Sequence, residues 1–241
     1  MLEAQPLFGK ALAFIGTPKK FWPIVETLYR WVLMAGVKHF GAYYNYGRIL
    51  QEHRKYELAA EQFRKALELN PDLSGAYNNL GIVLCELGQH DESERTFRRA
   101  LAIEEYAKPH NNLAELYRRI GRLPEAKEEI LRAVALDPED PTVVSTLAQV
   151  LADMGEFAEA ERRYMEALSI APDDEEIHRE LGRLLIRLKR PREGQVHLEK
   201  ALALKKAKTP RKSSLDQWRG QSRASRQPRT RKVYGSKQRS A

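Results

Sequence analysis

The amino-acid sequence predicts an all-α solenoid of about five helical hairpins, followed by a C-terminal tail that we expect to be disordered. The 241-residue chain is rich in Ala, Leu, Glu, Lys and Arg, a composition that favours long helices over sheets. One pattern of large and small residues also returns roughly every 34 residues, as in repeat proteins. From Lys205 onward this pattern is lost, and 13 Lys or Arg residues stand against a single acidic residue.

The repeated unit contains an adjacent pair of a large and a small residue, followed later by alanine, an aromatic residue and a second alanine. The adjacent pair recurs as Tyr46-Gly47, Leu80-Gly81, Leu113-Ala114, Leu147-Ala148 and Leu181-Gly182. The later positions read Ala59, Phe63 and Ala66 in the first unit, and the fifth unit matches them most weakly. Large residues three or four positions apart form an apolar stripe, and small residues let a second helix approach closely. Each unit is therefore expected to be a helical hairpin.

The turn inside each hairpin is marked by a shared position. In three units this position is a glycine that is suited to the left-handed conformation at a helix end: Gly88, Gly121 and Gly155. Arg54 and Lys189 hold the same position in the outer units. We expect the first helix of every unit to end there.

This pattern strongly resembles the tetratricopeptide repeat (TPR) family over about residues 40–206. The resemblance implies a right-handed superhelix of five repeats, at about 40–73, 74–106, 107–140, 141–174 and 175–206. Residues 1–39 would then form an N-terminal apolar helix or a degenerate capping repeat, and residues 207–241 a basic disordered tail. The resemblance also implies a non-catalytic scaffold or assembly factor, which binds an extended peptide segment of another protein in its concave groove.

In the TPR family the first helix of each repeat lines the groove. One groove position carries asparagine in three repeats: Asn45, Asn79 and Asn112. The position before it carries asparagine in two repeats, as Asn78 and Asn111. The row of three resembles the asparagine ladder of the O-GlcNAc transferase superhelix, which grips peptide backbone. An asparagine amide offers a donor and an acceptor, so it can pair with any peptide bond. The alternative is that these amides bond only a neighbouring helix or water.

The groove positions toward the C-terminal end are basic. They are Lys108, Arg118, Arg119, Arg179, Arg183 and Arg187. An acidic peptide segment could dock on them. Alternatively, Asp153, Glu176 and Glu180 could neutralise part of the row and leave a solvated face. Only Asn79 and Lys108 match the carboxylate clamp of chaperone-binding TPR domains, so we do not expect a chaperone tail as the ligand.

Residues 20–38 read as a helix that is apolar on nearly all sides. Helical spacing places Val25, Trp31 and Val32 on one broad face and Tyr29 on the other. The residues expected to dock on a membrane interface, a membrane complex or another larger assembly are Phe21, Trp22 and Trp31. The alternative is that this segment caps the first repeat. Two charged residues interrupt the apolar run, so we do not expect it to cross a membrane.

The tail combines many cations with two aromatic residues. Its expected contact residues are Arg211, Lys212, Trp218, Arg219, Arg229, Arg231 and Lys232. Such a segment can neutralise phosphates and stack on unpaired bases, which makes it a candidate RNA or ribosome contact. Binding to an acidic lipid surface or an acidic protein is an alternative, and so is a role in solubility alone.

The sequence gives no indication of catalysis, of a metal site or of a cofactor. Its six histidines are scattered along the chain without metal-ligand spacing, and neither a nucleophile elbow nor a glycine-rich phosphate loop is present. Cys85 is the single cysteine, which excludes an intramolecular disulfide and favours a reducing compartment. We therefore expect a cytoplasmic protein without a small-molecule substrate, with peripheral membrane attachment as an option.

Overall fold

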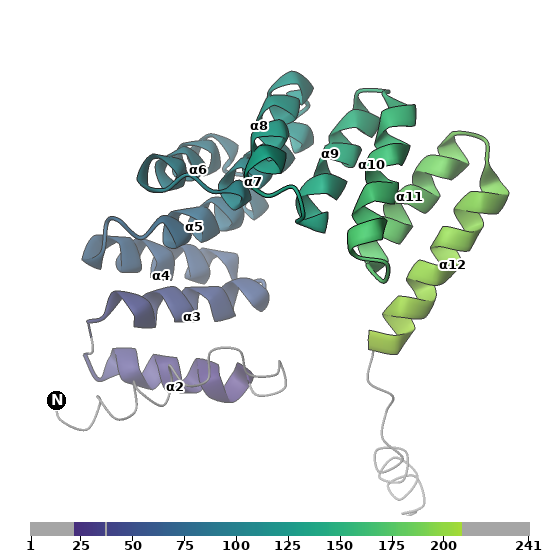
Figure 1. Ribbon diagram of the computed structural model, residues 1–241. Helices are drawn as coiled ribbons and strands as arrows, with labels where there is room; N and C mark the ends of the chain where they lie inside the picture. Colours follow the sequence, from purple (N-terminus) through teal and green to yellow (C-terminus); the bar gives the residue numbers. More distant parts are fainter. Residues whose placement is uncertain (1–21, 37, 209–241) are drawn as a thin grey trace, which may run out of the picture.

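The computed structural model describes residues 22–36 and 38–208, and this part of the chain is helical throughout, without a strand. The helices are α2 (Trp22–Met34), α3 (Phe40–Glu52), α4 (Tyr56–Leu69), α5 (Ser74–Glu86), α6 (His90–Ile103), α7 (Ala107–Arg119), α8 (Leu123–Leu136), α9 (Pro141–Asp153), α10 (Phe157–Ile170), α11 (Glu175–Arg187) and α12 (Pro191–Lys208). From α3 onward they pair into five hairpins, which stack side by side along an arc from α2 to α12 (Figure 1). The predicted all-α solenoid is confirmed.

Each hairpin turn uses the position that the sequence marks. Gly88, Gly121 and Gly155 have φ of +75°, +80° and +84°, and Arg54 and Lys189 adopt +56° and +61° in the outer hairpins. The residue after the turn donates a backbone hydrogen bond to a carbonyl five residues earlier in the chain. The Gln89 N–H donates to the Leu84 carbonyl at 2.9 Å, and the Arg122 N–H donates to the Tyr117 carbonyl at 2.8 Å. These bonds satisfy carbonyls that the helix end leaves without a partner.

Within the first two hairpins a glycine lets the two helices touch. A Cβ built on Gly47 would lie 2.7 Å from the Phe63 ring, and one on Gly81 would lie 2.6 Å from the Phe97 ring. Both phenylalanines are fully buried. In both hairpins the phenylalanine ring of the second helix therefore packs directly on the backbone of the first helix, as expected from the small residues at these positions.

Helix α2 packs against α3 through one side only. Val25, Tyr29 and Val32 are buried, and the Tyr29 ring stacks on Tyr46 with centroids 6.4 Å apart. The sequence-based faces were wrong in two respects, because Tyr29 joins the buried side and Trp31 is 65% exposed. A helix turns by roughly 100° per residue, so Val25, Tyr29 and Val32 lie close together around the axis while Trp31 lies well away from them.

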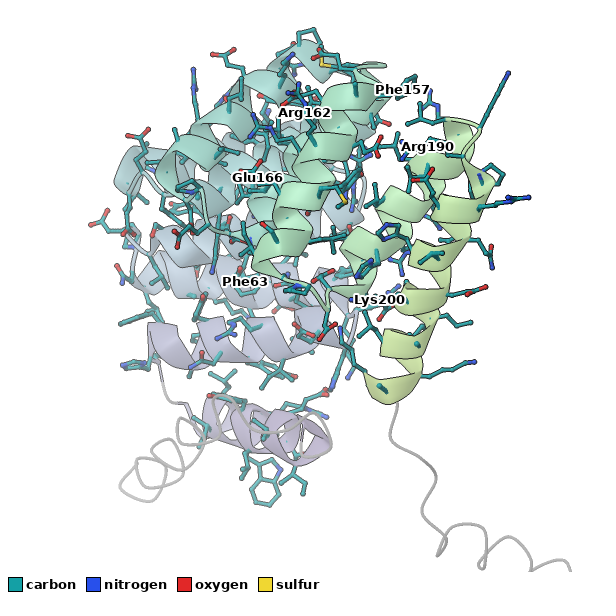
Figure 2. All side chains as sticks on the ribbon, turned by 45° about the vertical axis from the view of Figure 1, so that its right-hand side comes forward. Phe63, Phe157, Arg162, Glu166, Arg190 and Lys200 are labelled. Atoms are coloured by element: carbon teal, nitrogen blue, oxygen red, sulfur yellow. The ribbon has the colours of Figure 1, made fainter. Side chains whose placement is uncertain are left out.

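One ion pair recurs between consecutive hairpins. In most of these pairs, one residue lies in the first half of the second helix of a hairpin, and its partner directly precedes the second helix of the next hairpin. Glu161 of α10 and Arg190, which precedes α12 and is labelled in Figure 2, form one such pair. The pairs are Glu26–Lys55 at 2.6 Å, Glu94–Arg122 at 3.0 Å, Lys127–Glu156 at 2.7 Å and Glu161–Arg190 at 2.7 Å. Because Glu26 makes this pair from α2, α2 holds the place of a second helix relative to α3.

Candidate functional site

The concave face carries a pocket of about 630 Å³, formed mainly by the first helices of three consecutive hairpins. Helices α7, α9 and α11 supply nearly all of its lining, and Tyr164 of α10 lies at its base. Its uncharged polar lining consists of Asn111, Asn112, Thr142, Thr146 and Gln149. Its charged lining consists of Glu115, Asp153, Glu176, Glu180, Arg118, Arg183 and Arg187. The pocket is therefore polar and of mixed charge.

The two pocket asparagines differ in how they are bonded. The Asn112 amide nitrogen donates to the Asn78 side-chain oxygen at 2.8 Å, which ties α7 to α5. The Asn111 side-chain oxygen is buried, and among the described residues it has no hydrogen-bond partner. A buried carbonyl without a partner is costly, so the Asn111 amide retains unused hydrogen-bonding capacity at the wall of the pocket.

The remaining predicted asparagines bond other side chains of the helix stack. Asn45 is buried and hydrogen-bonds the Tyr29 side chain. The Asn79 amide donates to the Tyr44 hydroxyl at 3.3 Å, and the Asn78 amide donates to the Asn79 side-chain oxygen at 3.4 Å. Asn45, Asn78 and Asn79 do not line the pocket. These bonds correspond to the alternative in which the amides serve helix–helix contacts.

Most of the predicted basic row is paired with carboxylates. Burial lowers the pKa of Arg118, but hydrogen bonds to Glu115 and Asp153, at 2.9 and 3.0 Å, outweigh it and hold this pKa above its usual value. Arg183 pairs with Glu180 at 2.7 Å. The remaining pairs are Arg119 with Glu86 and Glu115, and Arg179 with Glu175 and Glu176. The groove is consequently much less basic than the arginines alone suggest.

Arg187 is the exception in the pocket. Its guanidinium lies 4.5 Å from the centre of the Phe157 ring and donates to the Ala152 carbonyl at 3.4 Å. In residues 22–36 and 38–208 no carboxylate pairs with it at salt-bridge distance. Lys108 is exposed on α7, outside the pocket.

Other predicted contact residues lie elsewhere. Trp31 is exposed on α2, whereas Phe21 and every tail residue from Arg211 to Lys232 lie outside the described residues. Trp22 begins α2, and its side chain is likewise not described. The sequence reasoning missed Thr142, Gln149 and Tyr164 as pocket residues. Thr142 and Gln149 occupy groove positions of the repeat, so their place in the repeat could have identified them as pocket residues.

The titratable groups of the described chain give no catalytic arrangement. His110 pairs with Glu129 at 2.6 Å, and the two δ nitrogens of His178 and His197 lie 2.9 Å apart, in each case between the two helices of one hairpin. Burial raises the pKa of the Cys85 thiol. Residues 22–36 and 38–208 contain no cluster of metal-ligating side chains, and no helix in these ranges is long and apolar enough to cross a membrane.

Comparisons with known structures agree with this architecture. The thermophilic TPR protein TTC0263 of Thermus thermophilus superposes with a TM-score of 0.65 at 20% identity, covering 76% of this chain and 99% of that one. PilF of Pseudomonas aeruginosa gives 0.61 at 23% identity, covering 68% and 75%. YrrB, described as a TPR protein with an unusual peptide-binding site, gives 0.51 at 19% identity, covering 80% and 97%. At these identities the likeness shows the fold alone.

Family models match the repeats directly. Two models described as tetratricopeptide repeat match residues 72–139 and 151–211, and one described as TPR repeat matches residues 47–88. No curated protein matches the sequence significantly. The three matched ranges together cover more than half of the chain, which therefore belongs to the tetratricopeptide repeat family, whose members are typically non-catalytic scaffolds for protein interactions.

Proposed function

We propose that the pocket across α7, α9 and α11 holds an extended peptide segment of another protein. The observation that carries this proposal is the row of amides along the pocket, Asn111, Asn112 and Gln149, in which the Asn111 oxygen is buried without a partner among the described residues. Amides offer donors and acceptors that match a peptide backbone whatever its side chains are. The proposed site shares Asn112 with the predicted row and extends from there toward the C-terminal end, away from Asn45 and Asn79.

The paired charges limit the kind of segment that fits. Arg118 and Arg183 already contact carboxylates of the pocket itself, so they offer little to a strongly acidic ligand. Arg187 remains available for one acidic side chain. We infer an extended segment that is near neutral overall and bound chiefly through its backbone. The peptide-binding site ascribed to YrrB supports a peptide as the class of ligand.

The test is a peptide selection followed by affinity measurements. A random peptide library displayed on phage is selected against the full chain, and enriched peptides are synthesised for calorimetry. The double variant Asn111→Ala/Gln149→Ala should bind these peptides more weakly by about 2 kcal/mol, since each net hydrogen bond contributes about 1 kcal/mol. The control is Arg162→Ala on the exposed outer side of α10, which is labelled in Figure 2 and should leave affinity unchanged.

The outcomes separate the alternatives. Equal affinity of the wild type and the double variant would place the peptide site elsewhere. Failure to enrich any peptide on the folded chain would reject the extended-peptide ligand class. A loss of binding in the Arg162→Ala control as well would move the site to the outer surface of the solenoid.

A further inference from the structure

The outward side of α2 carries an unusual apolar surface. Ile24, Trp31 and Met34 are 57%, 65% and 81% exposed, and their spacing of seven and three residues places them along one side of the helix. We call this surface the α2 stripe. The stripe points away from the side that Val25, Tyr29 and Val32 bury.

The positions equivalent to Ile24 and Trp31 are charged in most later second helices, although α4 has Leu58 at the first of them. Where α2 has Ile24 and Trp31, helix α6 has Glu92 and Arg99, α8 has Glu125 and Arg132, and α10 has Glu159 and Glu166. Those positions form the ordinary solvated outer face of an amphipathic helix. The α2 stripe therefore has apolar residues where α6, α8 and α10 have charged ones, and it lies at the opposite end of the described arc from α12 (Figure 1).

The charges around the stripe are of one sign. Arg30 and Lys38 are exposed and, within the described part of the chain, make no salt bridge to a carboxylate. Glu26 is the one acidic residue of α2, and its carboxylate is held by Lys55 at 2.6 Å and by His53 at 3.1 Å. An apolar strip with tryptophan, bordered by free cations and lacking a free carboxylate, complements an anionic interface.

We propose that the α2 stripe docks the protein on an anionic lipid surface. Ile24, Trp31 and Met34 enter the boundary between headgroups and acyl chains, while Arg30 and Lys38 contact the headgroups. A second copy of this chain is a poorer occupant, because one face of a 13-residue helix is far smaller than the roughly 800 Å² per partner of a stable interface. The two copies of Arg30 would also repel each other across a twofold axis.

The test is vesicle flotation of the full chain. The wild type, Ile24→Ser/Trp31→Ser and the control Leu131→Ser/Met165→Ser are compared on phosphatidylcholine vesicles with and without phosphatidylglycerol. The control residues, Leu131 of α8 and Met165 of α10, are 48% and 52% exposed. The control variant therefore removes an exposed apolar surface comparable to that of Ile24 and Trp31 from another part of the molecule. The wild type and control should float with anionic vesicles, and the stripe variant should show about a tenfold lower bound fraction. The basic tail is identical in all three chains, so the difference isolates the stripe.

Four results would overturn the proposal. Equal flotation of the stripe variant and the wild type would assign the lipid binding to the tail. No flotation of the wild type would mean that the protein does not bind these vesicles. A lower melting temperature of the stripe variant would show that the chain itself covers these side chains. Loss of a dimer in sedimentation velocity would make a second copy the occupant.

Discussion

The two halves of the concave face use similar residues for different purposes. In the N-terminal half, Tyr44, Asn78 and Asn79 bond one another across α3 and α5. In the C-terminal half, the same repeat positions on α9 carry Ser145 and Thr146, whose hydroxyls both bond the Thr142 carbonyl of their own helix. Side chains that reach the next helix stabilise the stack, whereas short ones leave an open pocket.

The size of one residue explains much of this difference. Tyr44 extends across the groove until its hydroxyl would lie 3.3 Å from a Cβ placed on Gly75. Asn111 and Ser145 take the position of Tyr44 in the third and fourth hairpins, and they are too short to cross the same space. A repeat position therefore fixes where a side chain begins. Its length and the partner on the next helix decide whether it bonds there, because Asn78 at this position accepts a hydrogen bond from Asn112 whereas the Asn111 oxygen has no partner among the described residues.

The packing within the hairpins gives the largest expected contrast. Gly81→Ala places a Cβ against the buried Phe97 ring, and overpacking of this kind typically costs about 1–3 kcal/mol in unfolding free energy. Ala114 holds the same position in the next hairpin and is buried, so Ala114→Gly should cost about 1–2 kcal/mol, through helix propensity and the loss of one buried methyl group. Urea denaturation followed by circular dichroism compares them. If Gly81→Ala proves the milder change, the hairpins do not differ in the way that the glycine contacts indicate.

The asparagines provide a second, smaller contrast. Asn112→Ala removes the 2.8 Å bond to Asn78 and should lower the unfolding free energy by about 1 kcal/mol. Asn111→Ala removes a buried oxygen that has no partner among the described residues, so it should leave stability unchanged or raise it slightly. The same denaturation experiment measures both variants. Equal losses would mean that the two pocket asparagines do not differ in the way that their hydrogen bonds indicate.

Much of the fold was predictable from the sequence, because hairpin packing depends on local features that recur. The turn at Gly88 and the close contact at Gly81 follow from single residues in repeating positions. The pairing of Lys127 with Glu156 was not predicted, because only the structure shows that residues at this separation meet between hairpins. The hydrogen bond between Asn79 and Tyr44 could not be predicted. Whether the Asn79 amide faces a ligand depends on the length of Tyr44, which belongs to the preceding hairpin.

The last hairpin, whose first helix α11 lines the pocket, contains a pH-dependent contact. Burial lowers the pKa of His197, and the nearby His178 and Lys200 lower it further. Because the folded state favours neutral His197, its stabilising contribution is complete above the ordinary histidine pKa of about 6.5 and is lost as the pH falls below it. The unfolding midpoint should therefore decrease from pH 7.5 to pH 5.5, and it should decrease less in His197→Gln. A pH dependence that is the same in both chains would exclude His197 as its source.

The smallest expected effect concerns the ion pairs between hairpins. Lys127–Glu156 has the opposite polarity to Glu94–Arg122 and Glu161–Arg190, and both of its side chains are partly exposed. Lys127→Glu should therefore cost only about 0.2–1 kcal/mol, and adding Glu156→Lys should restore most of the loss by re-forming the pair in the common polarity. A double-mutant cycle in urea at low salt measures the coupling. If the reversed double variant stays as unstable as Lys127→Glu, the local field at this junction sets the polarity of the pair. In that case the recurring ion pairs are not interchangeable links between hairpins.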